Sequence, residues 1–127
     1  MTPDFDIDLD SVRAFLAEKD RNRAAALDRA FNKAWKDFEA ITARIIERHS
    51  PRRVYQWGSL LDRSTFSEIS DIDIAVEGLS GPEAYFALVA DVSGLTTFPL
   101  DIIEMEKAGP ENADHIHSKG RLVYERD

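Results

Sequence analysis

The sequence predicts an α/β (α+β) domain: a small mixed sheet with helices mainly on one face, preceded by an N-terminal helical extension. Residues 9–50 contain neither Gly nor Pro, and their apolar side chains recur every three or four positions, as in helices. After Pro51, short β-like runs alternate with helix-like segments in the order β-β-α-β-α-β. With 127 residues we expect one domain, divided into a helical extension (1–34) and a core (35–127).

The helical extension is expected to begin with two separate helices. Residues 1–8 alternate acidic and apolar side chains and predict a loose arm. Asp10 or Ser11 can cap a first helix. The polar run 18–23 is expected to separate that helix from a second one over 23–49, with one continuous helix as the alternative.

The second expected helix carries an apolar stripe. Phe38, Ile41 and Ile45 lie at helical spacing and are expected to pack on the sheet. Other members of the stripe lie up to ~27 Å farther along the helix axis, beyond the reach of a small sheet. We expect the first helix or a partner chain to cover them. These members are Leu27, Phe31 and Trp35.

The core is expected to contain four strands and two helices. Pro51 ends the long helical region, and Pro82 fits the first turn of a later helix. Alternation in the second strand makes Ile72, Ile74 and Val76 its inward-facing set. The expected strands are 52–57, 71–77, 96–105 and 121–125, and the expected helices are 82–91 and 111–118.

Composition limits the classes of function. The net charge of −8 repels phosphates at long range, so a nucleic-acid polymer is disfavoured as a substrate. The absence of cysteine excludes disulfides and thiolate metal sites. No apolar run approaches the ~20 residues that span a membrane, and the acidic start lacks the basic region of a signal peptide. We therefore expect a cytoplasmic protein whose partner is a basic protein or a small molecule that brings Mg²⁺.

Two aspartates open the second expected strand. Alternate strand residues share a face, so Asp71 and Asp73 point the same way, with Cα atoms roughly 6–7 Å apart. Carboxylates this close repel each other unless a cation lies between them. Oxygen ligands with open coordination positions suit Mg²⁺ that carries a phosphorylated substrate. A lone Asp-x-Asp pair also occurs on solvated strand ends, so the surrounding residues decide its meaning.

Four further residues extend this candidate site. Gly58 lacks a Cβ and lets the backbone approach a phosphate closely. Ser59 follows at an expected helix start, where its hydroxyl and free N–H groups can hold an anion. Arg63 is a candidate donor to a triphosphate. Asp101 can complete a carboxylate triad and act as general base, because an aspartate on a buried-looking strand is costly unless paired or metal-bound.

Three segments together resemble the minimal nucleotidyltransferase (MNT) family of the DNA polymerase beta superfamily: Gly58-Ser59, Ser70-Asp-Ile-Asp-Ile-Ala-Val76 and Pro99-Leu-Asp-Ile-Ile103. The resemblance covers about residues 52–125. It implies that Asp71, Asp73 and Asp101 are the catalytic metal ligands and that Gly58 and Ser59 anchor the triphosphate. The implied reaction is Mg²⁺-dependent transfer of a nucleotidyl group, usually adenylyl from ATP, to a hydroxyl.

Many small members resemble the antitoxin of a toxin–antitoxin pair whose toxin is an all-helical HEPN ribonuclease. The resemblance therefore implies a toxin of this kind as partner and AMP transfer to one of its tyrosines. Eleven residues, 60–70, separate Ser59 from Asp71, one more than the usual family spacing. The loop also lacks the common Arg-Ala-Arg-Gly run. The helical extension exceeds what the minimal family needs, and we expect it to form a homodimer or partner surface.

Two alternative functions remain open. One is a catalytically weak or inactive binding module that neutralises a partner protein, which the long helices favour. The other is a small-molecule nucleotidyltransferase of the aminoglycoside type, whose substrate pocket would need a dimer partner. Outside the main motifs, we expect packing from Trp57, Tyr85 and Phe86. Glu104 is expected to be solvated or near the strand end. His115 and His117 are expected to be surface residues.

Overall fold

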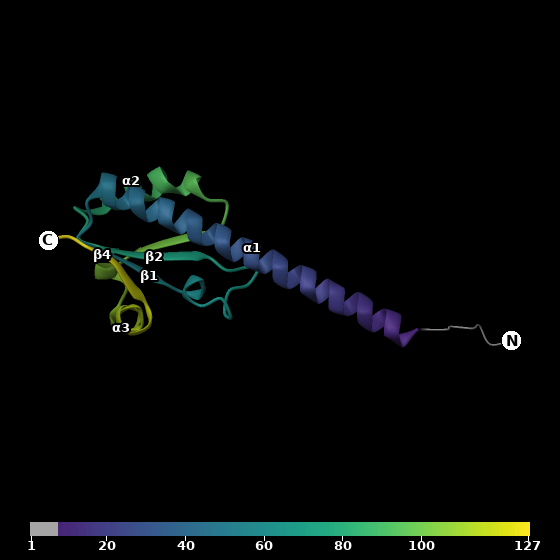
Figure 1. Ribbon diagram of the computed structural model, residues 1–127. Helices are drawn as coiled ribbons and strands as arrows, with labels where there is room; N and C mark the ends of the chain where they lie inside the picture. The colour runs from purple at the N-terminus through teal and green to yellow at the C-terminus, as the bar shows by residue number, and fades with distance from the viewer. Residues whose placement is uncertain (1–7) are drawn as a thin grey trace.

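The computed structural model describes residues 8–127 as one long helix packed on a four-stranded sheet with two shorter helices (Figure 1). The α/β prediction is confirmed. The helices are α1 (Leu9–His49), α2 (Pro82–Val92) and α3 (Pro110–Lys119). The strands are β1 (Arg53–Trp57), β2 (Ile72–Glu77), β3 (Leu100–Glu104) and β4 (Arg121–Glu125). Short 3₁₀ turns follow three of the elements: η1 (Ser59–Leu61), η2 (Ser93–Leu95) and η3 (Met105–Lys107).

α1 is one continuous helix of 41 residues, so the expected break at 18–23 is wrong. That run consists largely of Glu, Lys and Arg with no Gly or Pro, and these long side chains favour helix. The cap also lies earlier than expected. Asp8 accepts hydrogen bonds from the N–H groups of Asp10 (3.1 Å) and Ser11 (3.3 Å). The loose arm expected at 1–8 lies outside the described residues apart from Asp8.

The sheet has the strand order β3-β2-β1-β4. β1 pairs antiparallel with both β2 and β4, while β2 and β3 are parallel. α1 and α2 cover one face and α3 lies on the other (Figure 1), so the expectation of helices mainly on one face is confirmed. This order puts β3 at one edge of the sheet.

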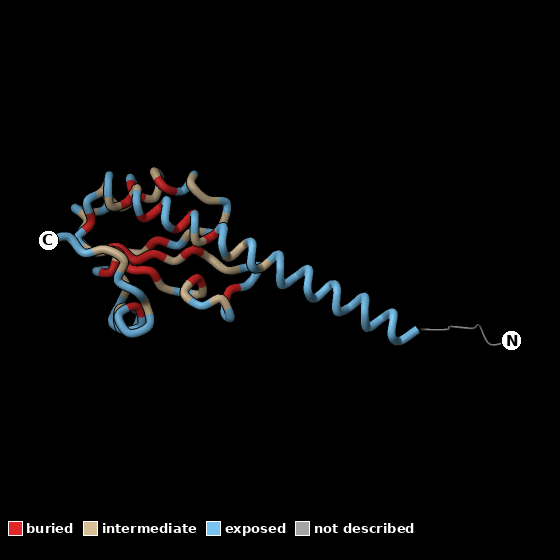
Figure 2. The backbone as a smooth tube through the Cα atoms, viewed as in Figure 1, coloured by how far each residue is buried: buried red, intermediate tan, exposed pale blue. Residues whose placement is uncertain are grey.

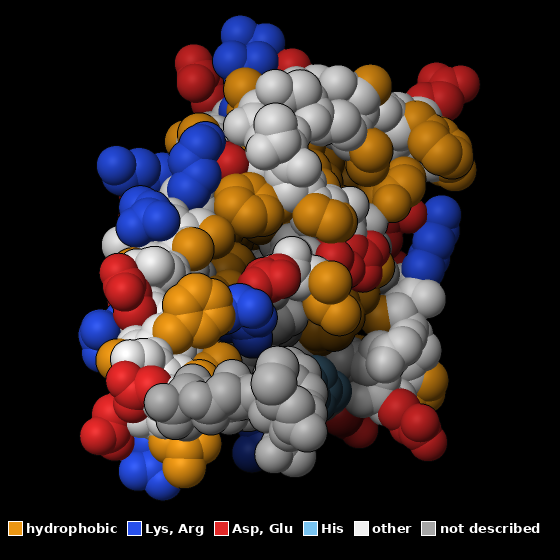
Figure 3. Space-filling model, turned by 90° about the vertical axis from the view of Figure 1, so that its right-hand side faces the viewer, with side chains coloured by type: hydrophobic (Ala, Val, Ile, Leu, Met, Phe, Trp, Pro, Cys, Tyr) orange, Lys and Arg blue, Asp and Glu red, His pale blue; other side chains and the backbone are white. Residues whose placement is uncertain are grey.

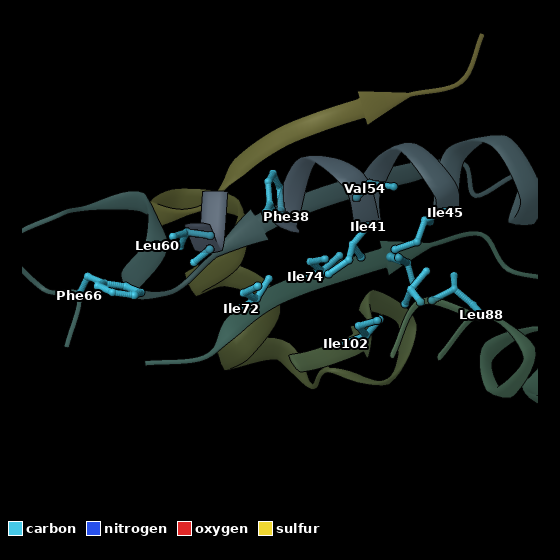
Figure 4. Packing of buried hydrophobic residues seen from close by; sticks show 13 residues of the cluster. Phe38, Ile41, Ile45, Val54, Leu60, Phe66, Ile72, Ile74, Leu88 and Ile102 are labelled. Carbon is cyan, nitrogen blue, oxygen red and sulfur yellow. The ribbon is translucent and has the colours of Figure 1, made fainter. Parts of the chain in front are cut away.

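The main core lies between α1, α2 and the sheet (Figure 4). Phe38, Ile41 and Ile45 of α1 are almost completely buried there, as predicted. The inward set of β2 is also confirmed, because Ile72, Ile74 and Val76 belong to the same cluster. Side chains at the intervening positions of β2 therefore point to the opposite face, where Asp73 lies.

The chain itself partly covers the apolar residues farther along α1, which corrects the expectation that another helix or chain would be needed. Phe31 packs edge-to-face on Phe66 of the loop before β2, with ring centroids 5.4 Å apart. The guanidinium of Arg121 lies over the Trp35 ring, 5.4 Å from its centroid. Leu27 is partly buried against the same core.

The first part of α1 projects beyond the domain (Figures 1 and 2). Residues 8–26 are all exposed, including four large apolar side chains. These are Leu9, Val12, Phe15 and Leu16. We call residues 9–26 the projecting segment. In the part of the chain that the structure describes, no helix is both long and apolar enough to cross a membrane.

β3 is shorter than the strand expected at 96–105. Pro99 has no N–H to give to a sheet, and the preceding residues form a turn. There the Thr96 hydroxyl donates to Asp37 (2.8 Å) and accepts from the N–H of Phe98 (3.1 Å). Met105 already belongs to η3. The remaining expected boundaries agree with the structure to within one residue at each end.

Candidate active site

The parallel pairing of β2 and β3 brings two predicted carboxylates together. Asp73 and Asp101 are register partners on neighbouring strands, so their side chains leave the same face of the sheet. Asp71 lies directly before β2, at the end where both strands begin. Strands in a sheet are about 4.8 Å apart, so the three carboxylates share a small region.

The pKa of the Asp73 carboxyl is raised by its surroundings. This side chain is half-buried, and loss of solvent raises the pKa of its carboxyl to about 6. The neighbouring charges of Asp101 and Asp71 also contribute to the raised pKa, in that order of importance. A carboxylate held against two like charges favours a bound cation, which would relieve the repulsion.

The oxygen-only donor set fits Mg²⁺. Within residues 8–127, no group of three histidine or acidic side chains is placed so that it could hold a metal ion, and this includes the three aspartates. Mg²⁺ is usually held by one or two carboxylates together with water and substrate phosphates, rather than by a complete protein cage. Asp71 and Asp73 could supply the protein ligands, with Asp101 beside them. The metal-ligand assignment of these three residues stays a prediction.

Gly58 lies in direct contact with this group. A Cβ added here would lie 2.0 Å from Oδ2 of Asp73 and 2.9 Å from its Cγ. Its backbone has φ 86° and ψ −165°, a conformation that residues with side chains rarely adopt. Glycine therefore leaves room for the Asp73 carboxylate, in addition to the expected approach to a phosphate.

Ser59 begins η1, so a helical turn does start at the expected position. It is a single 3₁₀ turn of three residues, shorter than the helix expected after Gly58. The completely buried Leu60 fixes this turn to the main core. The partly exposed Ser59 is thereby held next to Gly58 at the end of β1, and its contact with a triphosphate stays a prediction.

Arg63 is turned toward α1. Its Nε donates to Oδ1 of Asp28 at 2.7 Å, and one terminal nitrogen lies 3.5 Å from the carbonyl oxygen of Ala24. Both side chains of the ion pair are solvent-accessible, which makes the pair weak enough to exchange partners. The structure does not bring Arg63 to the carboxylates, and its role at a triphosphate stays a prediction.

Asp101 is exposed, so the expectation of a buried aspartate at this position was wrong. β3 is an edge strand, and its outward positions remain open to solvent. Asp73, on the central strand β2, is instead the half-buried carboxylate. The sequence could not separate the two, because both stand between apolar neighbours.

The other candidates have structural contacts. Trp57 packs on the second apolar cluster below the sheet, and its ring lies 6.4 Å from that of His115. His117 lies against Tyr55 with ring centroids 5.5 Å apart. Both histidines are exposed on α3, as predicted. Glu104 is the last residue of β3, so the expected place near the strand end is confirmed. Its side chain is mostly covered and pairs with Lys107 at 3.0 Å.

One part of the site was missed from the sequence. A cavity of about 410 Å³ lies beside Asp101 and is lined on one side by Tyr85 and Phe86 of α2. These aromatic residues were expected to pack, but Phe86 is 68% exposed. No sequence pattern could have shown this, because the cavity joins α2, β3 and the start of α3 across the sheet edge.

Figure 3 is viewed from the side toward which the projecting segment of α1 points, so this segment lies in front of the domain. Acidic side chains lie near the middle of this face, bordered by hydrophobic side chains and basic ones.

Comparison with known proteins places this arrangement in a family. The family model "Polymerase beta, Nucleotidyltransferase" matches residues 39–127, which include all the candidate site residues. A solved structure described as "Crystal structure of the toxin-antitoxin with AMP-PNP" is similar to this chain in fold, with a TM-score of 0.57 and 19% identity. The likeness covers 70% of this chain and 74% of the other. No match was found among curated proteins. From its core helix to its last strand, the chain belongs to the polymerase beta nucleotidyltransferase family.

Proposed function

We propose that this protein is a Mg²⁺-dependent nucleotidyltransferase that moves AMP from ATP to a hydroxyl of a protein partner, as the antitoxin of a toxin–antitoxin pair. One observation carries the proposal. The register of β2 and β3 places Asp73 beside Asp101, with Asp71 near enough to act on the pKa of Asp73. Gly58 adjoins the same carboxylate. These placements support a common role for the four residues.

The chain's own residues have distinct tasks in this reaction. Gly58 and Ser59 would hold the β- and γ-phosphates at the end of β1. Mg²⁺ held by Asp71 and Asp73 would neutralise charge on the phosphate oxygens. The acceptor oxygen forms a bond to the α-phosphorus and the α–β bridging oxygen departs with pyrophosphate, taking the bonding electron pair. The acceptor's proton passes to Asp101, which is exposed and open to an incoming group.

The fold likeness to the toxin–antitoxin structure supports an adenine nucleotide and a protein partner. That structure contains AMP-PNP, an ATP analogue, and pairs an antitoxin with its toxin. A basic or neutral partner such as a HEPN-type toxin would also suit the net charge of −8. The surface for it would include the projecting segment, whose apolar side chains are exposed. A homodimer through the same segment is the competing arrangement.

The experiment uses a small all-helical ribonuclease-like protein as partner, taken from a reading frame adjacent to the gene of this protein if one is found there. This partner is incubated with the protein, Mg²⁺ and ATP labelled at the α-phosphate. The proposal predicts covalent label on the partner with the wild type and none with Asp71→Asn plus Asp73→Asn. Equal labelling by the double variant, or no labelling by the wild type, would reject it.

A second candidate is a binding module that neutralises its partner without turnover. The exposed projecting segment favours it, because such a helix can bind a partner whether or not the carboxylates work. In that case the double aspartate variant would still neutralise the partner in a ribonuclease assay. A variant without the projecting segment would not.

A further inference from the structure

The apolar stripe that anchors α1 to the sheet continues onto the projecting segment. At 3.6 residues per turn, positions eighteen apart are about five turns apart and lie on the same face of a helix. Leu9 stands eighteen positions before Leu27, which packs on the main core. Leu16 stands eighteen positions before the completely buried Ala34. The face of α1 that packs on the sheet therefore extends beyond the sheet, where residues 8–127 leave it exposed (Figure 2).

An apolar groove lies where the projecting segment leaves the domain. Its volume is about 290 Å³. A cavity of about 150 Å³ lined by apolar side chains takes up a benzene ring, so this groove has room for one or two side chains. Its apolar walls are Leu27, Ala30, Phe66 and Phe98. Ile69 lies next to it on the loop before β2 and is 88% exposed. The groove thus ends the exposed stripe with further apolar surface that gains from being covered.

We propose that the projecting segments of two copies of this chain pair antiparallel, and that each places Leu9 and Val12 in the groove of the other. Leu9 and Leu27 are ~27 Å apart along the helix axis at 1.5 Å per residue. If a two-fold axis passes close to position 18, Leu9 of one copy lies opposite Leu27 of the other, and the two Leu16 side chains meet near the axis. Stripe and groove occur on one chain at matching distances, so a second copy satisfies both of them twice. A different protein would need a stripe and a groove of its own.

Charged residues along the stripe fit the same pairing. Arg13 and Asp20 are seven positions apart on one side of the stripe, too far apart to meet within one helix. In the antiparallel register, Arg13 lies within one turn of Asp20 of the second copy, and the two-fold axis forms this pair twice. Lys19 and Arg23 face the seam, where their long stems can lie along apolar surface with the charged groups in water. Charges in a helix seam cost stability and fix its register.

The size of the contact sets the expected affinity. The paired helices would touch over ~27 Å of their length and ~10 Å of their width. With the two grooves, such a contact lies near the lower limit of specific interfaces, about 1,200 Å² in total. We therefore expect a dimer that dissociates in the micromolar range.

Pairing leaves one face of the projecting segment open. Phe15 stands eighteen positions before Lys33, whose side chain is largely exposed, so Phe15 lies outside the seam. A second copy and a protein partner can therefore use different faces of the same helix, and they compete only for the face that carries Leu9 and Leu16.

Sedimentation equilibrium of the full chain, from about 1 to 300 μM, tests the pairing. The wild type should change from monomer to dimer over this range. Leu9→Glu together with Leu16→Glu should weaken the dimer at least about tenfold, because four charges enter the apolar seam. Phe15→Glu is the matched control on the open face and should dimerise like the wild type, with equal helix content by circular dichroism. A wild type that stays monomeric at the highest concentration, or equal loss in the control, would overturn the proposal.

A charge exchange tests the antiparallel register. Arg13→Glu places a glutamate near Asp20 of the second copy and should weaken the dimer about 3- to 10-fold, because two attractive pairs become repulsive. Asp20→Arg alone should weaken it similarly. The two changes combined restore opposite charges across the seam and should recover most of the affinity. Weakening that simply adds in the combined variant would contradict this register.

The groove has its own variant and control. Ile69→Glu adds a charge beside the groove without touching the helix and should weaken the dimer, whereas Leu122→Glu, at an exposed position of β4, should not. Equal dimerisation of both variants would remove the groove from the interface. Pairing is independent of the proposed transfer, so Asp71→Asn plus Asp73→Asn should dimerise like the wild type. A failure of AMP transfer would leave the dimer standing, and a monomeric wild type would leave the transfer reaction standing.

Discussion

A Cβ at Gly58 would lie 2.0 Å from Oδ2 of Asp73, so the end of β1 accommodates only glycine beside this carboxylate. The contact couples two motifs that are fifteen positions apart in the sequence. Gly58 follows one strand directly, and Asp73 lies in the antiparallel neighbour, opposite Trp57. The position of the carboxylate therefore depends on a residue that has no side chain of its own.

Gly58→Ala is predicted to displace the Asp73 carboxylate and to abolish AMP transfer. The change also strains a backbone conformation that is almost restricted to glycine, at a cost of about 1–3 kcal/mol. Transfer is measured with α-labelled ATP, and the free energy of unfolding is measured with urea.

Gly81→Ala is the matched control for Gly58→Ala. Gly81 also has a strongly positive φ, 110°, but a Cβ there would meet nothing within 4 Å. It should lose similar stability and keep transfer activity. Loss of transfer in both variants to the same extent would show that backbone strain, and not the contact with Asp73, causes the effect.

Asp73→Asn is predicted to stabilise the fold while removing activity. The pKa of Asp73 is raised from 3.8 to about 6, so the folded state binds its proton more tightly than the unfolded state. Ionisation therefore costs stability as pH rises from about 4 through 6, and the cost is complete at pH 7. After discounting for solvent screening at a half-buried site, we expect a gain of about 1–2 kcal/mol at pH 7.

The pH dependence checks the sign of this effect. Below about pH 4 the carboxyl is protonated in both states, so the gain from Asp73→Asn should vanish there. Urea unfolding at pH 7 and at about pH 3 measures the gain. Asp114→Asn, at an exposed position of α3, is the matched control for the change of side chain. A gain in acid as large as at neutral pH would be inconsistent with a raised pKa.

Removal of residues 1–22 is predicted to leave the domain stable and to weaken partner binding. All described residues of this segment are exposed, and the core begins farther along at Ala34. The thermal midpoint, followed by circular dichroism, should change by only a few degrees. Partner affinity, measured by calorimetry, should fall at least about tenfold if the exposed apolar side chains bind it.

Phe15→Asp together with Leu16→Asp keeps the helix length and tests the same surface. These residues are 65% and 50% exposed, so the fold does not depend on them. The double variant should lose partner affinity like the truncated chain. Full affinity in both would exclude the projecting segment as the interface.

Much of the fold could be predicted because each element has a local signal. Pro51 and Pro82 mark helix boundaries, and the alternation around Ile74 shows which face of β2 is buried. The break expected at 18–23 failed because a polar run need not interrupt a helix when its residues favour helix. The run is polar because this part of α1 is exposed to solvent, which depends on the tertiary structure. The local sequence could not distinguish an exposed stretch of continuous helix from a break between two helices.

The sequence predicted which residues belong to the candidate site. It predicted less well how deeply they are buried and which side chains they contact. Asp73 and Asp101 could be paired only by assuming that their strands are neighbours, which the parallel register bears out. Asp101 was expected to be buried and is exposed, because the sequence does not show that β3 is an edge strand. The ion pair of Arg63 with Asp28 joins positions far apart in the chain, and neither residue has a local signal for it.

The most direct test of the central claim is which phosphate of ATP reaches the partner. The partner protein is incubated with the wild type, Mg²⁺ and ATP labelled at either the α- or the γ-phosphate, and covalent label is measured after denaturation. We predict label from the α-position only, with none from Asp73→Asn. Transfer from the γ-position, or α-label that persists in Asp73→Asn, would contradict the proposed reaction.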